Sequence, residues 1–213
     1  MSILCSGLHG DVYQESDGKI QKIIFSKEKT TNEIQCLINF KGMYGIPKLY
    51  ATKHYISTSF KGKNSEGVYC PIKNKFIMKG PAIGIIMDNV GDLTLDDFKI
   101  LTNCQFQKVM FNAFYIIYTI YRKFHMVHGD LHRRNIVLKK AERYSKTYYI
   151  EGKKYRINDQ YYKVSVIDFD SCRPVENEVE DVIYLCSFFK DKFILKDTFI
   201  SFFESNFKIF EIT

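Results

Sequence analysis

Proline and glycine are scarce in this chain and its cysteines are not clustered, and each shortage excludes a class of protein. The 213 residues include 4 Pro and 12 Gly and are 46% hydrophobic, which is typical of a folded chain with a substantial core rather than a disordered one. The 6 Cys are scattered and form no Cys-x-x-Cys pair. A disulfide framework or a zinc site is therefore not expected, and a reducing intracellular compartment, cytoplasm or nucleus, is favoured.

Long apolar runs are also missing. The longest, from Val109 to Tyr121, is interrupted by Asn112 and is too short to span a bilayer, so no membrane partner is expected. Residues 1–10 lack a basic start followed by an apolar run, so no signal peptide is expected. Internal repeats and low-complexity segments are absent, and we expect one domain over residues 1–213.

Charge is unbalanced towards the basic side. With 31 Lys and Arg against 24 Asp and Glu, the formal net charge is +7. Such an excess favours anionic partners, namely a nucleotide, nucleic acid or an acidic surface. It is also common in proteins from AT-rich genomes, whose codons favour Lys, and that explanation takes the larger share.

The first part of the chain is expected to be mainly β. Residues 3–25 alternate as two strands around the turn Ser16–Gly18, and residues 48–88 alternate around a polar turn at 61–67. A helix is expected over residues 28–41. Its helically spaced residues are Ile34, Leu37, Ile38 and Lys41.

The pattern changes near residue 104. Apolar residues recur at helical spacing up to Phe124, which predicts a central helix. Residues 136–170 return to a small β insert, and two further helices are expected over Val182–Phe193 and Phe199–Phe210. The fold class is therefore α+β, with a β-rich segment 1–90, a mainly α segment 91–213 and a boundary near residues 88–96.

Two motifs carry the chemistry. The first runs from His128 to Asn135 (HGDLHRRN), and the second, Ile167–Asp170 (IDFD), follows a short apolar strand. Asp130 can accept or orient the proton of an incoming hydroxyl, while Asn135 and Asp168 offer the hard oxygen ligands that Mg²⁺ prefers. A lone Asp would be read as a solvated turn residue, but the three residues at this spacing favour metal-assisted phosphoryl transfer.

The pair of motifs resembles the catalytic and metal-binding loops of the protein-kinase superfamily. The resemblance implies a bilobal protein-kinase-like fold with a β-rich N-lobe (1–90) and a reduced, truncated α-helical C-lobe (91–213). It also implies ATP and Mg²⁺ as cofactors, a catalytic role for Asp130 and Asn135, and metal binding by Asn135 and Asp168.

Lys22 is the candidate for the lysine that pairs the α- and β-phosphates. It shares a strand face with Ile20, and the helix that follows offers Glu33 as its partner carboxylate. Lys19 is the competing lysine and Glu28 the competing carboxylate, and an ordinary strand-edge lysine is the plain alternative.

Two other segments resemble nucleotide-binding parts of a kinase. Residues 5–13 resemble the glycine-rich loop, with Gly7, Gly10 and Val12 in place and Cys5 where the first glycine would stand. Residues 85–93 resemble the hinge, where Asp88 and Val90 would offer backbone contacts to adenine. A simple turn and a strand ending in a loop explain these segments almost as well.

Three histidines lie close together in the sequence. His125, His128 and His132 lack the companions of a convincing zinc set. The resemblance implies a structural role for His128, and it places His132 at the position of a catalytic-loop lysine, where it would contact substrate or phosphate.

Departures from the common kinase pattern narrow the family. Gly129 replaces the usual Arg, and Asp170 replaces the Gly of Asp-Phe-Gly. The segment 180–185 resembles the helix whose Asp, here Asp181, braces the catalytic loop, and no Ala-Pro-Glu precedes it. We therefore expect a nearly absent activation segment and a kinase that is constitutively active or controlled by a partner.

The long gap between Asn135 and Asp168 resembles the extra hairpin of the haspin family, and similar short kinases are encoded by large DNA viruses, which would place the protein in a host cell. Haspin-type enzymes phosphorylate the histone H3 tail, so the resemblance implies a histone or another basic protein as substrate. The insert of this chain is itself basic, with many tyrosines. Such a mixture can bind nucleic acid, although a two-faced hairpin is the more frequent explanation.

Three functions compete. The leading one is a Ser/Thr protein kinase. A small-molecule kinase of the aminoglycoside or choline type uses similar motifs, but it needs a large helical substrate lobe and only about 40 residues follow Asp170. A pseudokinase that binds a partner is favoured by the incomplete glycine loop and disfavoured by the retained Asp130, Asn135 and Asp168.

Overall fold

The computed structural model describes residues 2–6, 10–24, 27–62, 68–70, 75–91, 93–175, 177–189 and 192–212. The chain divides into two compact units, a first of Met1–Gly42 with Pro47–Asn89 and a second of Met43–Ile46 with Val90–Thr213. The division after Asn89 coincides with the expected boundary. Met43–Ile46 differs from the expectation, because it groups with the second unit although it lies within 1–90.

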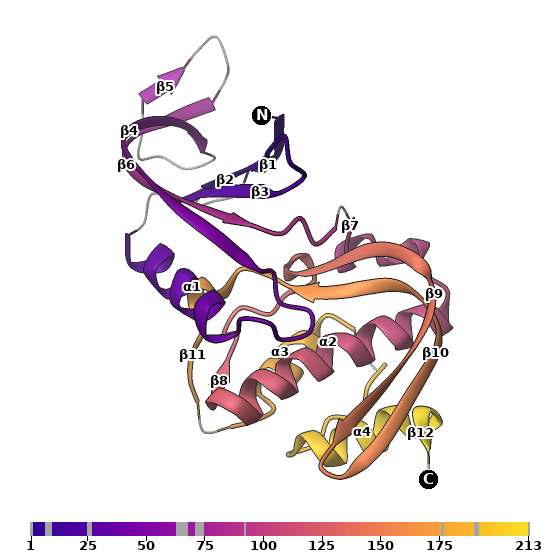
Figure 1. The fold of residues 1–213 in the computed structure, drawn as a ribbon. Coiled ribbons are helices and arrows are strands. Elements are labelled where there is room, and N and C mark those ends of the chain that lie inside the picture. The colour runs from indigo at the N-terminus through magenta and orange to yellow at the C-terminus, as the bar shows by residue number, and fades with distance from the viewer. Residues whose placement is uncertain are drawn as a thin grey trace. The chain divides into compact units, whose positions relative to one another are not determined.

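The first unit is built on an antiparallel sheet (Figure 1). Its strands are β1 (Ser2–Ser6), β2 (Gly10–Gln14), β3 (Ile20–Ile24), β4 (Leu49–Gly62), β5 (Val68–Cys70) and β6 (Lys75–Met87). The strand order is β1-β2-β3-β6-β4, and β5 pairs with β6. The expected turn joins β2 and β3, with Gly18 at φ 81°, and the expected turn at 61–67 lies largely outside the described residues.

Helix α1 (Lys27–Asn39) covers part of this sheet, but it presents a different face from the one expected. Ile38 is 52% exposed, whereas Glu33 is 1% exposed. The buried stripe consists of Thr30, Glu33, Cys36, Leu37 and Phe40. Of the four helically spaced residues, Leu37 is buried as expected, Ile34 is half-buried, and Ile38 and Lys41 are exposed. The buried stripe is shifted because the ion pair of Glu33 with Lys22 turns a polar residue inward.

The second unit is organised around α2 (Asn103–Phe124), the expected central helix. A capping box starts it: the Thr102 side chain accepts from the Gln105 N–H, and the Gln105 side chain accepts from the Thr102 N–H. His125 ends it in a left-handed conformation, φ 51°. Apolar residues are buried on most sides of α2, which is why it forms the centre of the unit.

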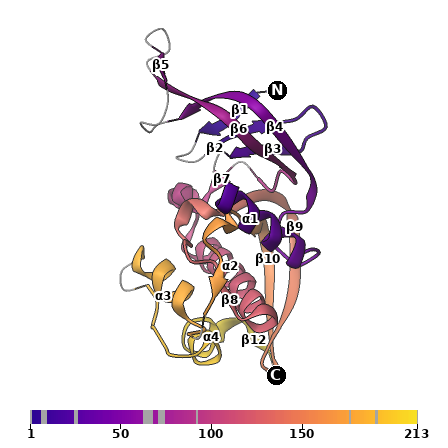
Figure 2. The same cartoon turned by 90° about the vertical axis from the view of Figure 1, so that its left-hand side faces the viewer.

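A long hairpin lies along α2 (Figures 1 and 2). Strands β9 (Ile136–Ile150) and β10 (Lys153–Val166) pair over most of their length, with β7 (Leu93–Thr94) and β12 (Glu211–Ile212) on the outer edges. At the tip, Glu151 (φ 46°) and Gly152 (φ 80°) both take the positive φ of a type I′ turn. The expected small insert is therefore the main sheet of this unit.

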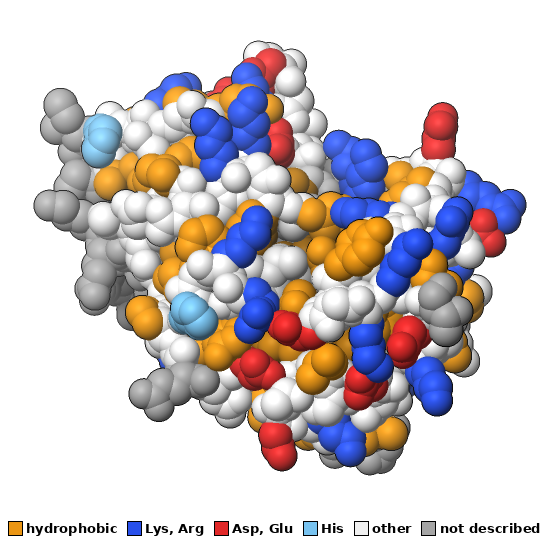
Figure 3. Space-filling model, turned by 60° about the horizontal axis from the view of Figure 1, so that its bottom comes forward, with side chains coloured by type: hydrophobic (Ala, Val, Ile, Leu, Met, Phe, Trp, Pro, Cys, Tyr) orange, Lys and Arg blue, Asp and Glu red, His pale blue; other side chains and the backbone are white. Residues whose placement is uncertain are grey.

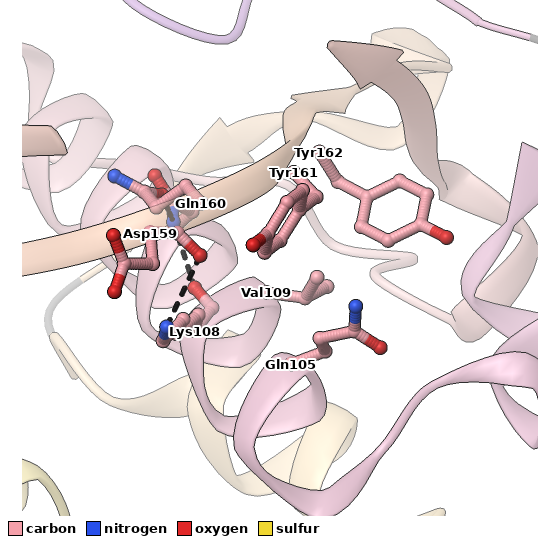
Figure 4. A pocket seen from close by; sticks show the side chains of 8 residues that line it. Gln105, Lys108, Val109, Asp159, Gln160, Tyr161 and Tyr162 are labelled. Carbon is pink, nitrogen blue, oxygen red and sulfur yellow. Dashed lines mark hydrogen bonds between the residues drawn. The ribbon is translucent and has the colours of Figure 1, made fainter. Parts of the chain in front are cut away.

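A buried polar network fastens the hairpin to α2. The Asn112 Oδ1 accepts from the hydroxyls of Tyr44 (2.7 Å) and Tyr148 (2.5 Å), and its Nδ2 donates to Gln160 Oε1 (2.7 Å). The Lys108 Nζ donates to the carbonyl of Asp159 (3.1 Å), at a β-bulge of β10 (Figure 4). The cavity drawn there is about 10 Å³, room for about one water molecule and no larger ligand.

Two short helices complete the second unit. Helix α4 (Phe199–Phe207) packs against α2 through two buried rings. Phe202 contacts Phe114 with ring centroids 4.8 Å apart, and Phe203 contacts Phe111 with ring centroids 5.1 Å apart. The final stretch therefore closes this unit, and a helix lies within the expected range Phe199–Phe210. A short 3-10 turn at Lys208–Phe210, rather than more helix, leads into β12.

Helix α3 (Glu180–Ser187) is shorter than the expected Val182–Phe193. At its end, the backbone hydrogen bonds change from the i→i−4 pattern of an α-helix to the i→i−3 pattern of a 3-10 turn. The Phe189 N–H, for example, donates to the carbonyl of Cys186 (2.9 Å). Phe189 and Phe193 then pack on Phe106 of α2, with ring centroids 5.1 and 6.2 Å apart. This packing takes the chain off the helical path, which local periodicity could not reveal. The remaining short pairing in this unit is β8 (Met126–Val127) with β11 (Arg173–Pro174).

Within the described residues, no helix is long and apolar enough to cross a membrane. On the face presented in Figure 3, Lys and Arg side chains are spread among apolar and uncharged side chains.

Candidate active site

In the first unit, Lys22 and Glu33 form an ion pair. Lys22 lies on β3, opposite Val12 of β2 and Ile85 of β6, and its Nζ is 2.7 Å from Glu33 Oε2 on α1. The two side chains are 18% and 2% exposed, so the pair is largely removed from water. Removal of either partner would leave a poorly hydrated charge. Lys19, the competing lysine, instead pairs with Asp17 at the surface (2.5 Å).

The expected glycine-rich loop is only partly described. Gly7 lies outside the described residues. Gly10 begins β2 and pairs with Ile24 in the sheet register, and Val12 is half-buried opposite Lys22. Cys5 lies on β1 in register with Val12 of β2. Strand β1 is therefore at the edge of the sheet, and β2 lies between β1 and β3.

The expected hinge residues fall on either side of the division between the units. The Asp88 N–H donates to Lys48 O (3.1 Å), and its carboxylate accepts from the Lys48 N–H (3.0 Å) and the Tyr50 hydroxyl (2.9 Å). Within the part of the chain that the structure describes, the backbone carbonyl of Asp88 is therefore the atom of this residue left for a ligand. Val90 is the first residue of that part of the second unit and is half-buried.

In the second unit, His128 links the two motifs. Its Nε2 lies 2.8 Å from the carbonyl oxygen of Ile167, and its Nδ1 lies 3.3 Å from the Asp130 N–H. A carbonyl only accepts and an N–H only donates, so this arrangement requires a neutral imidazole protonated at Nε2. The ring is fully buried and packs on Phe169, with centroids 5.1 Å apart. These contacts match the structural role expected of His128.

Asp181 of α3 holds the backbone before Asp130. Its Oδ2 accepts from the His128 N–H (2.6 Å) and its Oδ1 from the Gly129 N–H (3.1 Å). Burial raises the pKa of Asp181, and these two N–H donors counteract that rise. Both carboxylate oxygens are thus committed to the backbone, which fits the bracing role expected of this residue.

Asp130 and Asn135 belong to one hydrogen-bonded loop. The Asn135 Nδ2 donates to the carbonyl of Asp130 (2.9 Å), and the Asn135 backbone carbonyl accepts from the Ile167 N–H (3.0 Å). Asn135 is 4% exposed, whereas the Asp130 side chain is 43% exposed. The loop is therefore rigid while the carboxylate of Asp130 remains accessible to solvent, with His132 Nε2 3.8 Å away.

Asp168 has an unusual backbone conformation. Its φ of 70° and ψ of 63° place it in the left-handed region, which a residue other than glycine occupies at a cost of about 1–3 kcal/mol. Its two sequence neighbours stabilise it there. Ile167 is hydrogen-bonded to His128 and Asn135, and Phe169 is buried. Strain of this kind clusters at functional sites.

The residues present fit a magnesium ion. Because the Asn135 Nδ2 is engaged by Asp130, its Oδ1 is the atom left to face a ligand, and no described residue donates to it. An amide oxygen and the Asp168 carboxylate are hard donors of the type that Mg²⁺ selects. Asn135 and Asp168 would therefore hold the ion.

A feature that the sequence did not reveal is the role of Asp96. Its two oxygens bind Arg133 and Arg134, each at 3.1 Å. Asp96 lies in a 3-10 helix (Leu95–Ile100), far from the arginines in sequence, and no local signal links them. Two cations against one anion leave the loop after Asp130 positively charged.

An open hollow of about 370 Å³ lies beside the loop in the second unit. It is lined by Gly129 and by residues at and before α3: Asn177, Glu180, Asp181, Ile183, Tyr184 and Ser187. Ile183 and Tyr184 are 43% and 42% exposed, so the hollow has an apolar rim. It offers room for a bound chain segment within reach of the residue that precedes Asp130.

The fold and these loops define a protein of the kinase class. A family model described as "Haspin like kinase domain" matches residues 14–194, and the chain therefore belongs to that family. The solved structure of the Cydia pomonella granulovirus kinase PK-1 is similar, with a TM-score of 0.52 and 16% identity, over 83% of this chain and 52% of that one. At this identity the likeness shows the fold alone, and this chain spans about half the length of that protein. The search of curated proteins gave no match.

Replacement of Gly129, even by alanine, is expected to destabilise the fold. Its φ is +79°, and an added Cβ would lie 2.4 Å from the carbonyl oxygen of Ser171. We expect Gly129→Ala to lower the free energy of unfolding by about 1–3 kcal/mol or more, and the melting temperature by roughly 2–4 °C per kcal/mol. Gly152→Ala is the matched control, since φ there is +80° with nothing within 4 Å of the added Cβ. Equal melting temperatures for the two variants would show that the Ser171 contact is unimportant.

Proposed function

We propose that the chain is an Mg²⁺- and ATP-dependent serine/threonine protein kinase, which transfers the γ-phosphate of ATP to a protein hydroxyl. The observation that carries the proposal is the hydrogen-bonded frame of the second unit. In that frame Asp130, Asn135 and the strand end before Asp168 are joined through His128, while the carboxylate of Asp130 remains accessible. Membership of a kinase family implies ATP as the donor.

Each residue has a separate task in this proposal. Asp130 accepts or orients the proton of the substrate hydroxyl. Asn135 and Asp168 bind Mg²⁺, which neutralises the phosphate charge when bound. Lys22 pairs with the α- and β-phosphates, and Glu33 holds its Nζ in place. Gly10 and Val12, with Gly7, would lie along the phosphates, and Asp88 O and Val90 would contact the adenine.

Features of the second unit support a protein substrate. The hollow beside Gly129 has an apolar rim in Ile183 and Tyr184. The positive balance around Arg133 and Arg134 does not favour a basic segment, so an acidic protein belongs in the test beside histone H3.

The test is a radiolabelled-ATP assay of the wild type with Mg²⁺ and with EDTA, on casein, histone H3 and a small alcohol such as choline. Label on serine or threonine of a protein, dependent on Mg²⁺, is expected. Label on the small alcohol alone would favour a small-molecule kinase. Transfer to no acceptor at all would favour a pseudokinase.

Lys22→Met is expected to lower the transfer rate by about 10²–10³-fold, because a preorganised cation facing the phosphates is lost. Lys19→Met is the matched control, since Lys19 ends the same turn but pairs with Asp17 at the surface. Equal activity of the Lys22→Met variant and the wild type would refute the role of Lys22 in phosphate binding. Equal loss in both variants would point to a general effect of charge.

A further inference from the structure

The two faces of the β9–β10 hairpin differ in composition. The face toward α2 buries Tyr148, Tyr155, Ile157 and Gln160. By strand alternation and register, the opposite face carries most of the exposed side chains of the hairpin, although Lys140 and Glu142 are exposed on the other side. Its charged and aromatic members, here called the outer hairpin face, are Lys139, Arg143, Tyr149, Lys154, Arg156, Tyr161 and Lys163.

The charge of the hairpin that carries the outer hairpin face is mainly positive. The two strands together hold eight Lys and Arg residues against two acidic residues, Glu142 and Asp159. Of the two acidic residues, Asp159 is bound by Arg143 at 2.6 Å. Opposite charges across strands stabilise a sheet and like charges destabilise it, so a merely solvated face would mix the two signs. The bias instead favours an anionic ligand.

Aromatic rings are exposed among these cations. Tyr149 is 63% exposed and lies opposite Lys154, while Tyr161 is 40% exposed on the same face. A merely anionic ligand needs no such rings. Unpaired bases, however, stack on exposed aromatic side chains of a sheet while nearby cations contact the phosphates.

The length of the face also fits an extended strand of nucleic acid. At about 3.3 Å per residue, the stretch from Lys154 to Lys163 is roughly 30 Å long. OB folds, which bind single strands on a sheet surface, accommodate about 4–16 nucleotides. Among the described residues, β9 is the strand paired with β10 beyond Tyr155, where the register with β12 ends.

We propose that the outer hairpin face binds single-stranded nucleic acid, RNA or DNA, by base stacking on Tyr149 and phosphate contacts to Arg156, Lys154 and Lys163. This property is separate from the proposed phosphoryl transfer, because none of these residues belongs to the loops around Asp130 and Asp168. Tyr149 distinguishes the proposal from binding of an acidic protein, which would use the cations and not the ring.

The test is fluorescence anisotropy of the full chain with labelled 12-nucleotide oligo-U and oligo-dT, a 12-base-pair duplex and a poly-Glu peptide. Both single strands are expected to bind more tightly than the duplex and the peptide, and a difference between them would identify RNA or DNA. The logarithm of the affinity should fall with log[salt] by about 0.7 per phosphate contact. Equal binding of the peptide, or no binding of single strands, would overturn the proposal.

Variants locate the contact. The double variant Arg156→Gln/Lys163→Gln should reduce the salt slope by about 1.4, whereas Lys123→Gln/Lys196→Gln, two exposed lysines elsewhere in the unit, should not. Tyr149→Ala should weaken binding by about fivefold or more, and Tyr149→Phe should retain it. All these variants should retain phosphoryl transfer to a protein. Full binding by Tyr149→Ala would refute stacking.

Discussion

Replacing Asp130 by Asn is expected to lower the rate of phosphoryl transfer by about 10²–10⁴-fold while the melting temperature stays unchanged. The reason lies in which atoms of Asp130 hold the loop. Its carbonyl accepts from Asn135 and His132, each at 2.9 Å, and its N–H donates to His128. The carboxylate is 43% exposed, and its charged neighbour among the described residues is His132, 3.8 Å away. An Asn side chain of equal size therefore removes the proton acceptor without disturbing the frame.

The matched variant is Asp168→Asn, which removes a metal ligand instead of the proton acceptor. We expect it to raise the Mg²⁺ concentration needed for half-maximal rate, since a neutral amide binds Mg²⁺ more weakly than a carboxylate. Asp130→Asn should leave that concentration unchanged. The measurement is a Mg²⁺ titration of initial rates for the three proteins. Wild-type activity in Asp130→Asn would exclude Asp130 as the proton acceptor.

The loop from His128 to Asn135 was recognisable in the sequence because its residue types and their spacing fall within eight consecutive residues. Hydrogen bonds join His128 to Asp130 and Asp130 to Asn135 inside that stretch. The contacts of the loop with Asp181 and Ile167 are long-range and had no comparable local signal. The central helix α2 was predictable for a similar reason: its apolar spacing and its capping residue Thr102 act within a few residues.

Other parts depend on contacts between distant residues, and local patterns missed them. Helix α1 turns Glu33 inward although Ile34 and Ile38 lie on an apolar stripe, because the sheet supplies Lys22 as a partner. Helix α3 ends early because Phe189 packs against α2. The pairing of Asp96 with Arg133 likewise has no local signal. In each case the tertiary contact contributes more free energy than the local conformational preference of the residues, which amounts to a few tenths of a kcal/mol per residue.

The substitution of Gly for Arg before Asp130 shows how a departure from a family pattern acquires a physical reason. The sequence shows only that Gly129 removes a charged side chain. The structure adds a positive φ and the close approach of the Ser171 carbonyl, which leave no room for any Cβ. The close contact joins Gly129 to Ser171, and Ser171 directly follows Asp170. The two departures from the common kinase motifs, at 129 and 170, therefore lie at or next to the same backbone contact.

The largest effect on stability is expected from Asp181→Ala. Asp181 is 4% exposed, and its two oxygens accept the N–H groups of His128 and Gly129. A buried N–H left without an acceptor, as at His128, costs about 1–3 kcal/mol, and the part-buried N–H of Gly129 adds less. We therefore expect a loss of about 2–4 kcal/mol and a melting temperature lower by roughly 4–15 °C. Differential scanning fluorimetry of the purified chain measures it.

Two variants separate this effect from a general loss of charge. Asp181→Asn keeps one acceptor oxygen and should recover about half of the lost stability, which also tests the idea if the alanine variant does not fold. Glu180→Ala removes the neighbouring carboxylate, which pairs with Arg173 at the surface, and should cost about 0–1 kcal/mol. Because Asp181 acts only by placing the backbone of His128 and Gly129, transfer activity should fall in the order of the stability loss across the three variants. A stable Asp181→Ala protein with full activity would show that the loop before Asp130 holds its conformation without this carboxylate.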